Sequence, residues 1–125
     1  MSRVLLDTHV FMWWIQEPSR IRPEWLESVL DPDNSVHVSA ACAWEIETKK
    51  RIGKLSFDHA VADVASEFGF EHLSVTIDHA ALAGSLDWNH RDPFDRIIVA
   101  QALSNEMILI TSDAAVKSAP GVRVL

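Results

Sequence analysis

Short apolar runs and longer mixed segments alternate along the chain. The apolar runs have the length of β-strands and lie at residues 3–6, 35–38, 72–75, 107–111 and 122–125. The segments between them repeat apolar positions three and four residues apart, which predicts helices. The expected helices span 9–15, 23–30, 40–52, 57–68, 79–86, 93–103 and 114–117. Strands that alternate with helices favour an α/β fold with a mainly parallel sheet and helices on both faces.

The helix expected at 93–103 has a start with several independent signals. Asp92 is a good N-cap, and Pro93 suits the first helical position because its missing N–H would have had no partner there. Asp95 falls at the third helical position, where the helix dipole favours a carboxylate. Capping explains this pattern by itself. A second interpretation is that Asp95 faces a cation together with acids from elsewhere in the chain.

Composition limits the remaining possibilities. With 125 residues, 48% of them hydrophobic, and no repeat or linker, residues 1–125 are expected to form one domain with a full core. Cys42 is the only cysteine, which excludes an internal disulfide and makes the cytoplasm the expected compartment. Asp7 and His9 interrupt the apolar start, so neither a signal peptide nor a membrane span is expected.

Eighteen acidic against eleven basic residues give a net charge of -7, which argues against non-specific binding of duplex nucleic acid through a basic face. A carboxylate site that holds a metal adds negative charge itself, and the ion reverses the local field. The acidic balance is therefore compatible with a nucleic-acid substrate.

Four acids are placed so that a parallel sheet would gather them. Asp7 follows the first expected strand, Asp113 follows the strand at 107–111, and Asp95 lies in the first turn of the helix that leads into that strand. Glu45 lies six residues beyond the helix cap Ser39, hence about 9 Å along its helix. Open α/β folds bind ligands at the edge where strands end and helices begin.

Each acid also has a simple structural explanation. Asp7, Asp95 and Asp113 suit caps or turns, and Glu45 is spaced to pair with Lys49. Four gathered carboxylates would repel one another, so the cluster makes sense mainly with a divalent metal. All-oxygen ligands select Mg²⁺ or Mn²⁺, which with a phosphate substrate is nuclease chemistry.

Four segments, taken together and in order, resemble the PIN-domain family, and within it the VapC-type toxin ribonucleases of bacterial toxin–antitoxin pairs. They are LLDTHVFMWW, SAACAWEIETKKRIGKL, HRDPFDRIIVAQAL and LITSD. The likeness implies a three-layer α/β/α sandwich and a Mg²⁺-dependent endoribonuclease, with Mn²⁺ as a substitute and no nucleotide cofactor. It also implies an RNA substrate, a homodimer and a cognate antitoxin.

Matched position by position, the acids that the family uses for metal binding and catalysis fall on Asp7, Glu45, Asp95 and Asp113. Thr111 matches a supporting hydroxyl residue, and Asp92 is kept as a cap. The sequence departs from the family at Leu86-Asp87-Trp88, where Leu-Pro is expected, and it lacks a tyrosine near its end. These departures concern substrate contacts and packing rather than the acids.

Basic, histidine and aromatic residues near the acids have open roles. Lys49, Arg91 and Arg96 are candidates for contacts with RNA or antitoxin. The alternative is that they are solvated or pair with nearby acids. His9 and His90 lack metal-ligand spacing, so surface or hydrogen-bonding roles are expected. The aromatic run 11–15 is either core or a groove for a partner's helix.

Two other functions remain open from sequence. An aspartyl-phosphate phosphatase would use Asp7 as nucleophile, but that class resembles Asp-x-Asp and the third position here is His9. The other is a catalytically silent PIN-like module that binds RNA or protein, which the presence of all four acids disfavours.

Overall fold

A single parallel sheet organises the chain. The computed structural model describes residues 1–125, and all four strand pairings in it are parallel. The strands are β1 (Arg3–Leu6), β2 (Ser35–Ser39), β3 (Glu71–Leu73), β4 (Ile108–Ile110) and β5 (Arg123–Val124). Their order is β3-β2-β1-β4-β5, so β1 is central and has β2 on one side and β4 on the other. The parallel sheet expected from the alternating pattern is confirmed.

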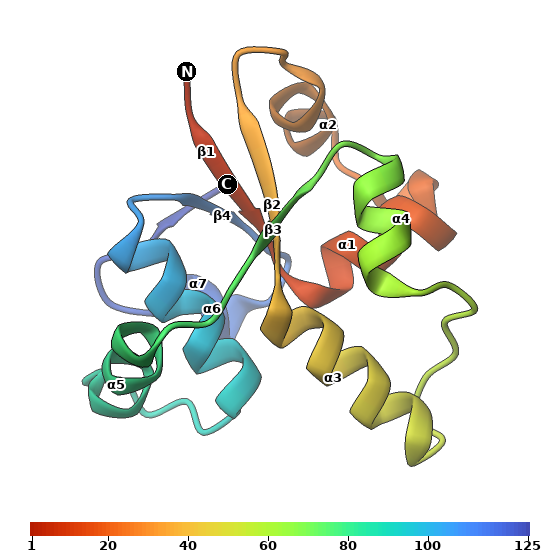
Figure 1. Cartoon of the computed structure of the whole chain (residues 1–125). Coiled ribbons are helices and arrows are strands. Elements are labelled where there is room, and N and C mark those ends of the chain that lie inside the picture. The colour runs from red at the N-terminus through yellow and green to blue at the C-terminus, as the bar shows by residue number, and fades with distance from the viewer.

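Helices follow most strands (Figure 1). They are α1 (Thr8–Gln16), α2 (Pro23–Leu30), α3 (Ala40–Arg51), α4 (Val61–Glu67), α5 (Ile77–Ser85), α6 (Pro93–Ser104) and α7 (Ala114–Lys117), with a short 3-10 helix at Pro18–Arg20. None of them has the length and apolarity that crossing a membrane requires.

The sheet is buried on both faces. Side chains of β1 alternate, so Val4 and Leu6 pack into one hydrophobic cluster while Leu5 packs into the other. The first cluster takes in residues of α1, α2 and α4, and the second takes in residues of α6 and α7. Helices on both sides of the sheet make a three-layer α/β/α sandwich, as expected (Figure 1).

Two predicted helix boundaries were wrong. The helix expected over 57–68 begins only at Val61, because Phe57 lies outside it and is buried against Phe11, with ring centroids 6.0 Å apart. Its apolar side chain anchors a loop to the core. The helix expected over 79–86 begins two residues earlier, at Ile77, since Thr76 caps it by accepting the backbone N–H of His79 at 3.1 Å.

The aromatic run in α1 belongs mainly to the core. Phe11 is fully buried, and the half-buried Trp13 and Trp14 pack against the same cluster. Trp13 stacks on the buried Trp25, with ring centroids 6.4 Å apart. Of the two interpretations of this run, the structure therefore favours packing between the layers.

Candidate active site

The carboxyl end of β1 places Asp7 inside the protein. Its side chain caps α1 by accepting the backbone N–H of Val10 at 2.9 Å, and its other oxygen accepts the hydroxyl of Thr111. Thr111 follows β4, the strand paired with β1, and is fully buried. Asp7 is thus both the cap expected from sequence and a buried carboxylate at the ligand-binding edge of the sheet.

The hydroxyl of Thr111 joins Asp7 to Asp113. It accepts the backbone N–H of Asp113 at 3.1 Å, while Asp113 caps α7 by accepting the N–H of Ala115 at 2.9 Å. Asp113 is exposed, and its charge raises the pKa of Asp7. These three residues form the first acidic group of the site, which we call the Asp7 group.

Glu45 is buried in α3 with a partner on each oxygen. Only 3% of its surface is exposed, and its carboxylate accepts the hydroxyl of Thr8 and the ammonium of Lys49. The pairing with Lys49, one helical turn later, is the structural role that the sequence left open. Burial lowers the pKa of Lys49, but the hydrogen bond and charge of Glu45 outweigh it and raise that pKa.

The start of α6 carries Asp92 and Asp95 with distinct roles. Asp92 caps the helix, accepting the N–H groups of Phe94 at 2.9 Å and Asp95 at 3.3 Å. One carboxylate oxygen of Asp95 lies 2.6 Å from Nε2 of His90. Glu45, Asp92 and Asp95 form the second acidic group, called the Asp95 group, because the charges of Glu45 and Asp92 both act on Asp95.

Burial and like charges disfavour ionisation in both groups. Burial raises the pKa of Asp95 to about 6. The hydrogen bond with His90 lowers this pKa, whereas the charges of Asp92 and Glu45 raise it further. Burial also raises the pKa of Asp7, although its bonds from Thr111 and Val10 oppose this. A nearby cation would favour the ionised forms, so both groups are prepared for positive charge.

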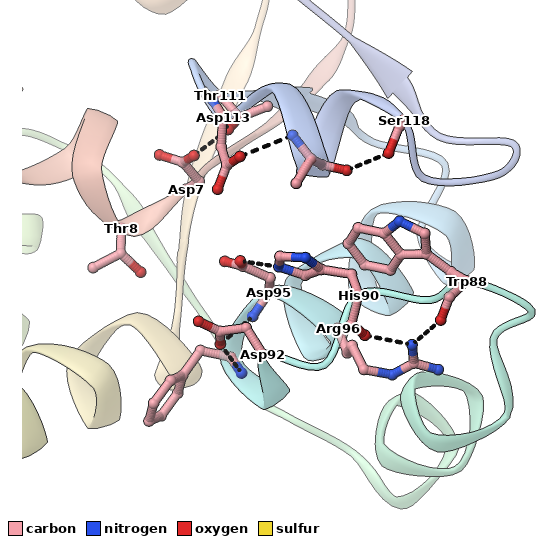
Figure 2. A network of polar contacts seen from close by, with 12 residues as sticks. Asp7, Thr8, Trp88, His90, Asp92, Asp95, Arg96, Thr111, Asp113 and Ser118 are labelled. Carbon is pink, nitrogen blue, oxygen red and sulfur yellow. Dashed lines mark hydrogen bonds and ion pairs between the residues drawn. The ribbon is translucent and has the colours of Figure 1, made fainter.

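The two groups face each other at the same edge of the sheet. In Figure 2, Asp7 and Asp113 lie above the gap, Asp92 and Asp95 lie below it, and Thr8 lies to one side. All the donors are carboxylate or hydroxyl oxygens, the ligands that Mg²⁺ and Mn²⁺ prefer. The donor chemistry therefore fits a divalent cation.

The spacing differs from the expectation of one shared pocket. No three Asp, Glu, His or Cys side chains lie close enough to hold one ion as they are placed. Glu45 and Asp95 are paired with Lys49 and His90, which neutralise part of the negative charge of the carboxylates. An ion shared by both groups requires these partners to yield.

Among the basic candidates, Arg96 has a structural task. Its guanidinium donates to the backbone oxygens of Ala83, Leu86, Trp88 and His90 at 2.6 to 2.9 Å. Because these contacts occupy the guanidinium, we do not retain the predicted RNA or antitoxin contact for Arg96. Arg91 is exposed and Lys49 is partly exposed.

Replacing Arg96 tests this role. We expect Arg96→Ala to lower the free energy of unfolding by roughly 2–3 kcal/mol, because four partly buried carbonyls lose a charged donor. Arg91→Ala, at an exposed neighbour, is the matched control and should change it by no more than about 0.5 kcal/mol. Urea unfolding measures both, and equal effects of the two variants would refute the assignment.

The raised pKa of Asp95 predicts a pH-dependent stability in metal-free buffer. The folded pKa of about 6 exceeds that of an unfolded aspartate, so the folded state binds more protons between the two values. The associated stability is complete below about pH 4 and is lost as the pH rises through the folded value, by at most ~3 kcal/mol. Urea unfolding from acid to neutral pH in EDTA should show this fall, and Asp95→Asn should reduce it. If the free energy of unfolding falls with pH as steeply in Asp95→Asn as in the wild type, the raised pKa of Asp95 is refuted.

Two supporting residues were missed or underestimated from sequence. Thr8 was not among the predicted site residues, but its hydroxyl donates a hydrogen bond to Glu45, which lies 37 positions away. His90 was expected to have a surface or hydrogen-bonding role, and its hydrogen bond to Asp95 agrees with the latter. In the sequence, only the position of Thr8 next to Asp7, and of His90 near Asp95, could have indicated that they support the site.

Comparisons with known proteins give a consistent result. The family model described as PIN domain matches residues 4–122. Ribonuclease VapC22 from Mycobacterium tuberculosis is 30% identical over 124 residues, covering 94% of this chain and 92% of that protein.

Solved structures share the fold. VapBC2 from Rickettsia felis, bound to a promoter DNA fragment, matches with a TM-score of 0.71 at 13% identity, covering 98% of this chain and 97% of that one. DNA-bound VapBC from Salmonella typhimurium matches with a TM-score of 0.71 at 19% identity, covering 100% and 98%. VapBC-5 from Mycobacterium tuberculosis, of the VapBC family of toxin–antitoxin systems, matches with a TM-score of 0.61 at 22% identity, covering 100% of this chain and 97% of that one.

Proposed function

The chain belongs to the PIN-domain family, and from this premise we propose that it is the toxin of a type II toxin–antitoxin pair, a metal-dependent endoribonuclease. One observation in the structure carries the proposal. Two acidic groups, each centred on a carboxylate with a raised pKa, face one another at the ligand-binding edge of a parallel sheet. The likeness to Ribonuclease VapC22 supports ribonuclease activity.

The residues divide into ligands and supports. Asp7, Glu45, Asp95 and Asp113 would hold Mg²⁺, with Mn²⁺ as a substitute. When bound, the metal supplies an activated water and stabilises charge on the phosphoryl oxygens. Thr111 orients Asp7 and Asp113, and Thr8 orients Glu45, through the hydrogen bonds described above.

Lys49 and His90 control charge in the Asp95 group. Lys49 neutralises Glu45, and His90 holds one oxygen of Asp95, leaving the other oxygen of that carboxylate without a hydrogen bond in the chain. Asp92 keeps the start of α6 in place through its two backbone contacts. Asp95 therefore has a fixed position and an available oxygen.

A cleavage assay tests the proposal directly. Purified chain is incubated with total RNA in Mg²⁺, in Mn²⁺ and in EDTA, and the ends of the products are mapped. We expect internal cuts with either metal and intact RNA in EDTA. RNA that is bound but never cut would instead indicate the silent binding module, and cutting that persists in EDTA would refute metal dependence.

The proposed function also implies an antitoxin partner, a homodimer and a cytoplasmic location. One of the matched structures, VapBC-5, belongs to the VapBC family of toxin–antitoxin systems, which supports a cognate antitoxin. We also propose a homodimer in the cytoplasm. Large apolar side chains at the surface, among them Leu30, Trp44 and Ile77, supply area for such contacts. Light scattering of the purified chain measures its oligomeric state, and a monomer at all concentrations would exclude the homodimer.

A further inference from the structure

A polar cavity lies beside the two acidic groups. Its volume is about 570 Å³, within the range of small-molecule sites. Residues 87–90 line one side, and Ala115, Ser118 and Pro120 line the other. Figure 2 shows Trp88 and His90 on the loop side and Ser118 on the α7 side, away from Asp7.

The cavity adjoins both acidic groups through its own lining. His90 is hydrogen-bonded to Asp95, and α7 begins directly after Asp113. A strand of RNA with a phosphate between Asp95 and Asp113 would therefore place a neighbouring nucleotide at the cavity. This placement rests on the proposed ribonuclease function.

The loop wall is aromatic and firmly held. The rings of Trp88 and His90 are stacked, with centroids 4.6 Å apart and planes inclined by 25°. Arg96 fixes the loop through the backbone oxygens of Leu86, Trp88 and His90. An aromatic wall on a fixed loop is suited to stacking with an unpaired base.

Polar groups at the rim remain free to select the base. The side chains of Asp87 and Asn89 are exposed and make no hydrogen bond or ion pair within the chain. The polar contacts of this loop are made instead by Arg96 and by the side chain of His90. A carboxylate accepts hydrogen bonds and cannot donate them. Asp87 therefore favours bases with an exocyclic amino group.

We propose that this cavity, here called the Trp88 pocket, binds an unpaired nucleobase next to the scissile phosphate and prefers bases with an exocyclic amino group (adenine, cytosine and guanine) to uracil, whose single N3–H is flanked by two carbonyl oxygens that repel a carboxylate. A basic side chain of a protein partner is the competing occupant. The structure favours the base, because the guanidinium of Arg96 already lies 5.9 Å from the Trp88 ring centroid and supplies positive charge there.

Nucleoside titration tests the pocket without requiring metal or cleavage. Adenosine, cytidine, uridine and N-acetylarginine amide are each added to the full chain in EDTA, while nuclear magnetic resonance follows the indole N–H signals. Trp88→Phe identifies the signal of Trp88. We expect adenosine and cytidine to shift that signal, and uridine to bind about fivefold more weakly, equivalent to ~1 kcal/mol.

Variants test the selection. Asp87→Ala should bind uridine and adenosine alike, whereas Asp33→Asn, an exposed acid in the turn before β2, should keep the preference. In RNA cleaved by the wild-type chain, uracil should be depleted, relative to the three bases with an exocyclic amino group, at one position beside the cut, and Asp87→Ala should lose this preference. An unchanged preference in the variant would refute the role of Asp87.

The two arms separate this proposal from the ribonuclease function. A Trp88 shift without any RNA cleavage would support the pocket and refute the ribonuclease. RNA cleavage without a Trp88 shift by any nucleoside would overturn the pocket alone. A shift by N-acetylarginine amide and by no nucleoside would overturn it too, in favour of a protein partner.

Discussion

Asp7→Asn and Asp95→Asn are each expected to reduce RNA cleavage on the order of a thousandfold while the chain stays folded. Asparagine keeps the size and one oxygen of each carboxylate but loses the negative charge that a divalent cation requires. Burial already raises the pKa of both residues, so a neutral side chain relieves a cost in the folded state. Initial rates of RNA cleavage in Mg²⁺ measure the loss.

The control for this prediction is Asp33→Asn. Asp33 is exposed and precedes β2, at the sheet edge opposite the acids. Its substitution makes the same chemical change and should leave the cleavage rate within about twofold of the wild type, since surface changes of this kind have small effects. Circular dichroism should show all three variants to be folded. Full activity of Asp7→Asn or Asp95→Asn in clean preparations would refute the assignment.

Mn²⁺ should stabilise the wild-type chain against heat. At a hundredfold excess over its dissociation constant, a ligand bound only by the folded state contributes about 2.7 kcal/mol, here an increase in melting temperature of roughly 10 °C. The reason is that the ion neutralises both acidic groups, which otherwise disfavour ionisation of Asp7 and Asp95. Thermal melts across a Mn²⁺ titration, reversed with EDTA, measure the effect.

A Mn²⁺ ion that bridges the Asp7 group and the Asp95 group should depend on both carboxylates. The double variant Asp7→Asn/Asp95→Asn should lose most of the Mn²⁺ stabilisation, whereas Asp33→Asn should keep it. If the double variant is stabilised as much as the wild type, the ion binds elsewhere. Because this readout requires no RNA, it distinguishes an absent metal site from an inactive nuclease.

Most of the fold could be predicted from local sequence patterns. The strand at Arg3–Leu6 and the cap at Asp92 were recognised because a buried strand and a capped helix start depend on neighbouring residues. The helix at Val61 was predicted too long because the apolar side chain of Phe57 matched the helical period. Its role is to contact Phe11, more than forty positions away, which local periodicity does not record.

The candidate site was predictable in part. The position of Asp7 and Asp113 after parallel strands placed them at one edge, and helical spacing suggested the Glu45–Lys49 pair. The hydrogen bond from Thr111 to Asp7 spans 104 positions, and no spacing rule relates those residues. The same holds for Thr8 and Glu45.

The sequence alone predicted most of the helices and strands, the parallel direction of the strands and the sheet edge to which the acids belong, because these features follow from local periodicity and from the geometry of parallel strands. The order of the strands in the sheet came only from the structure. Only the tertiary structure decided how the acids divide into two groups, that Lys49 and His90 are the internal partners of Glu45 and Asp95, and that Arg96 secures a loop. These outcomes depend on distances between side chains from separate segments. Such distances exist only once both cores have packed.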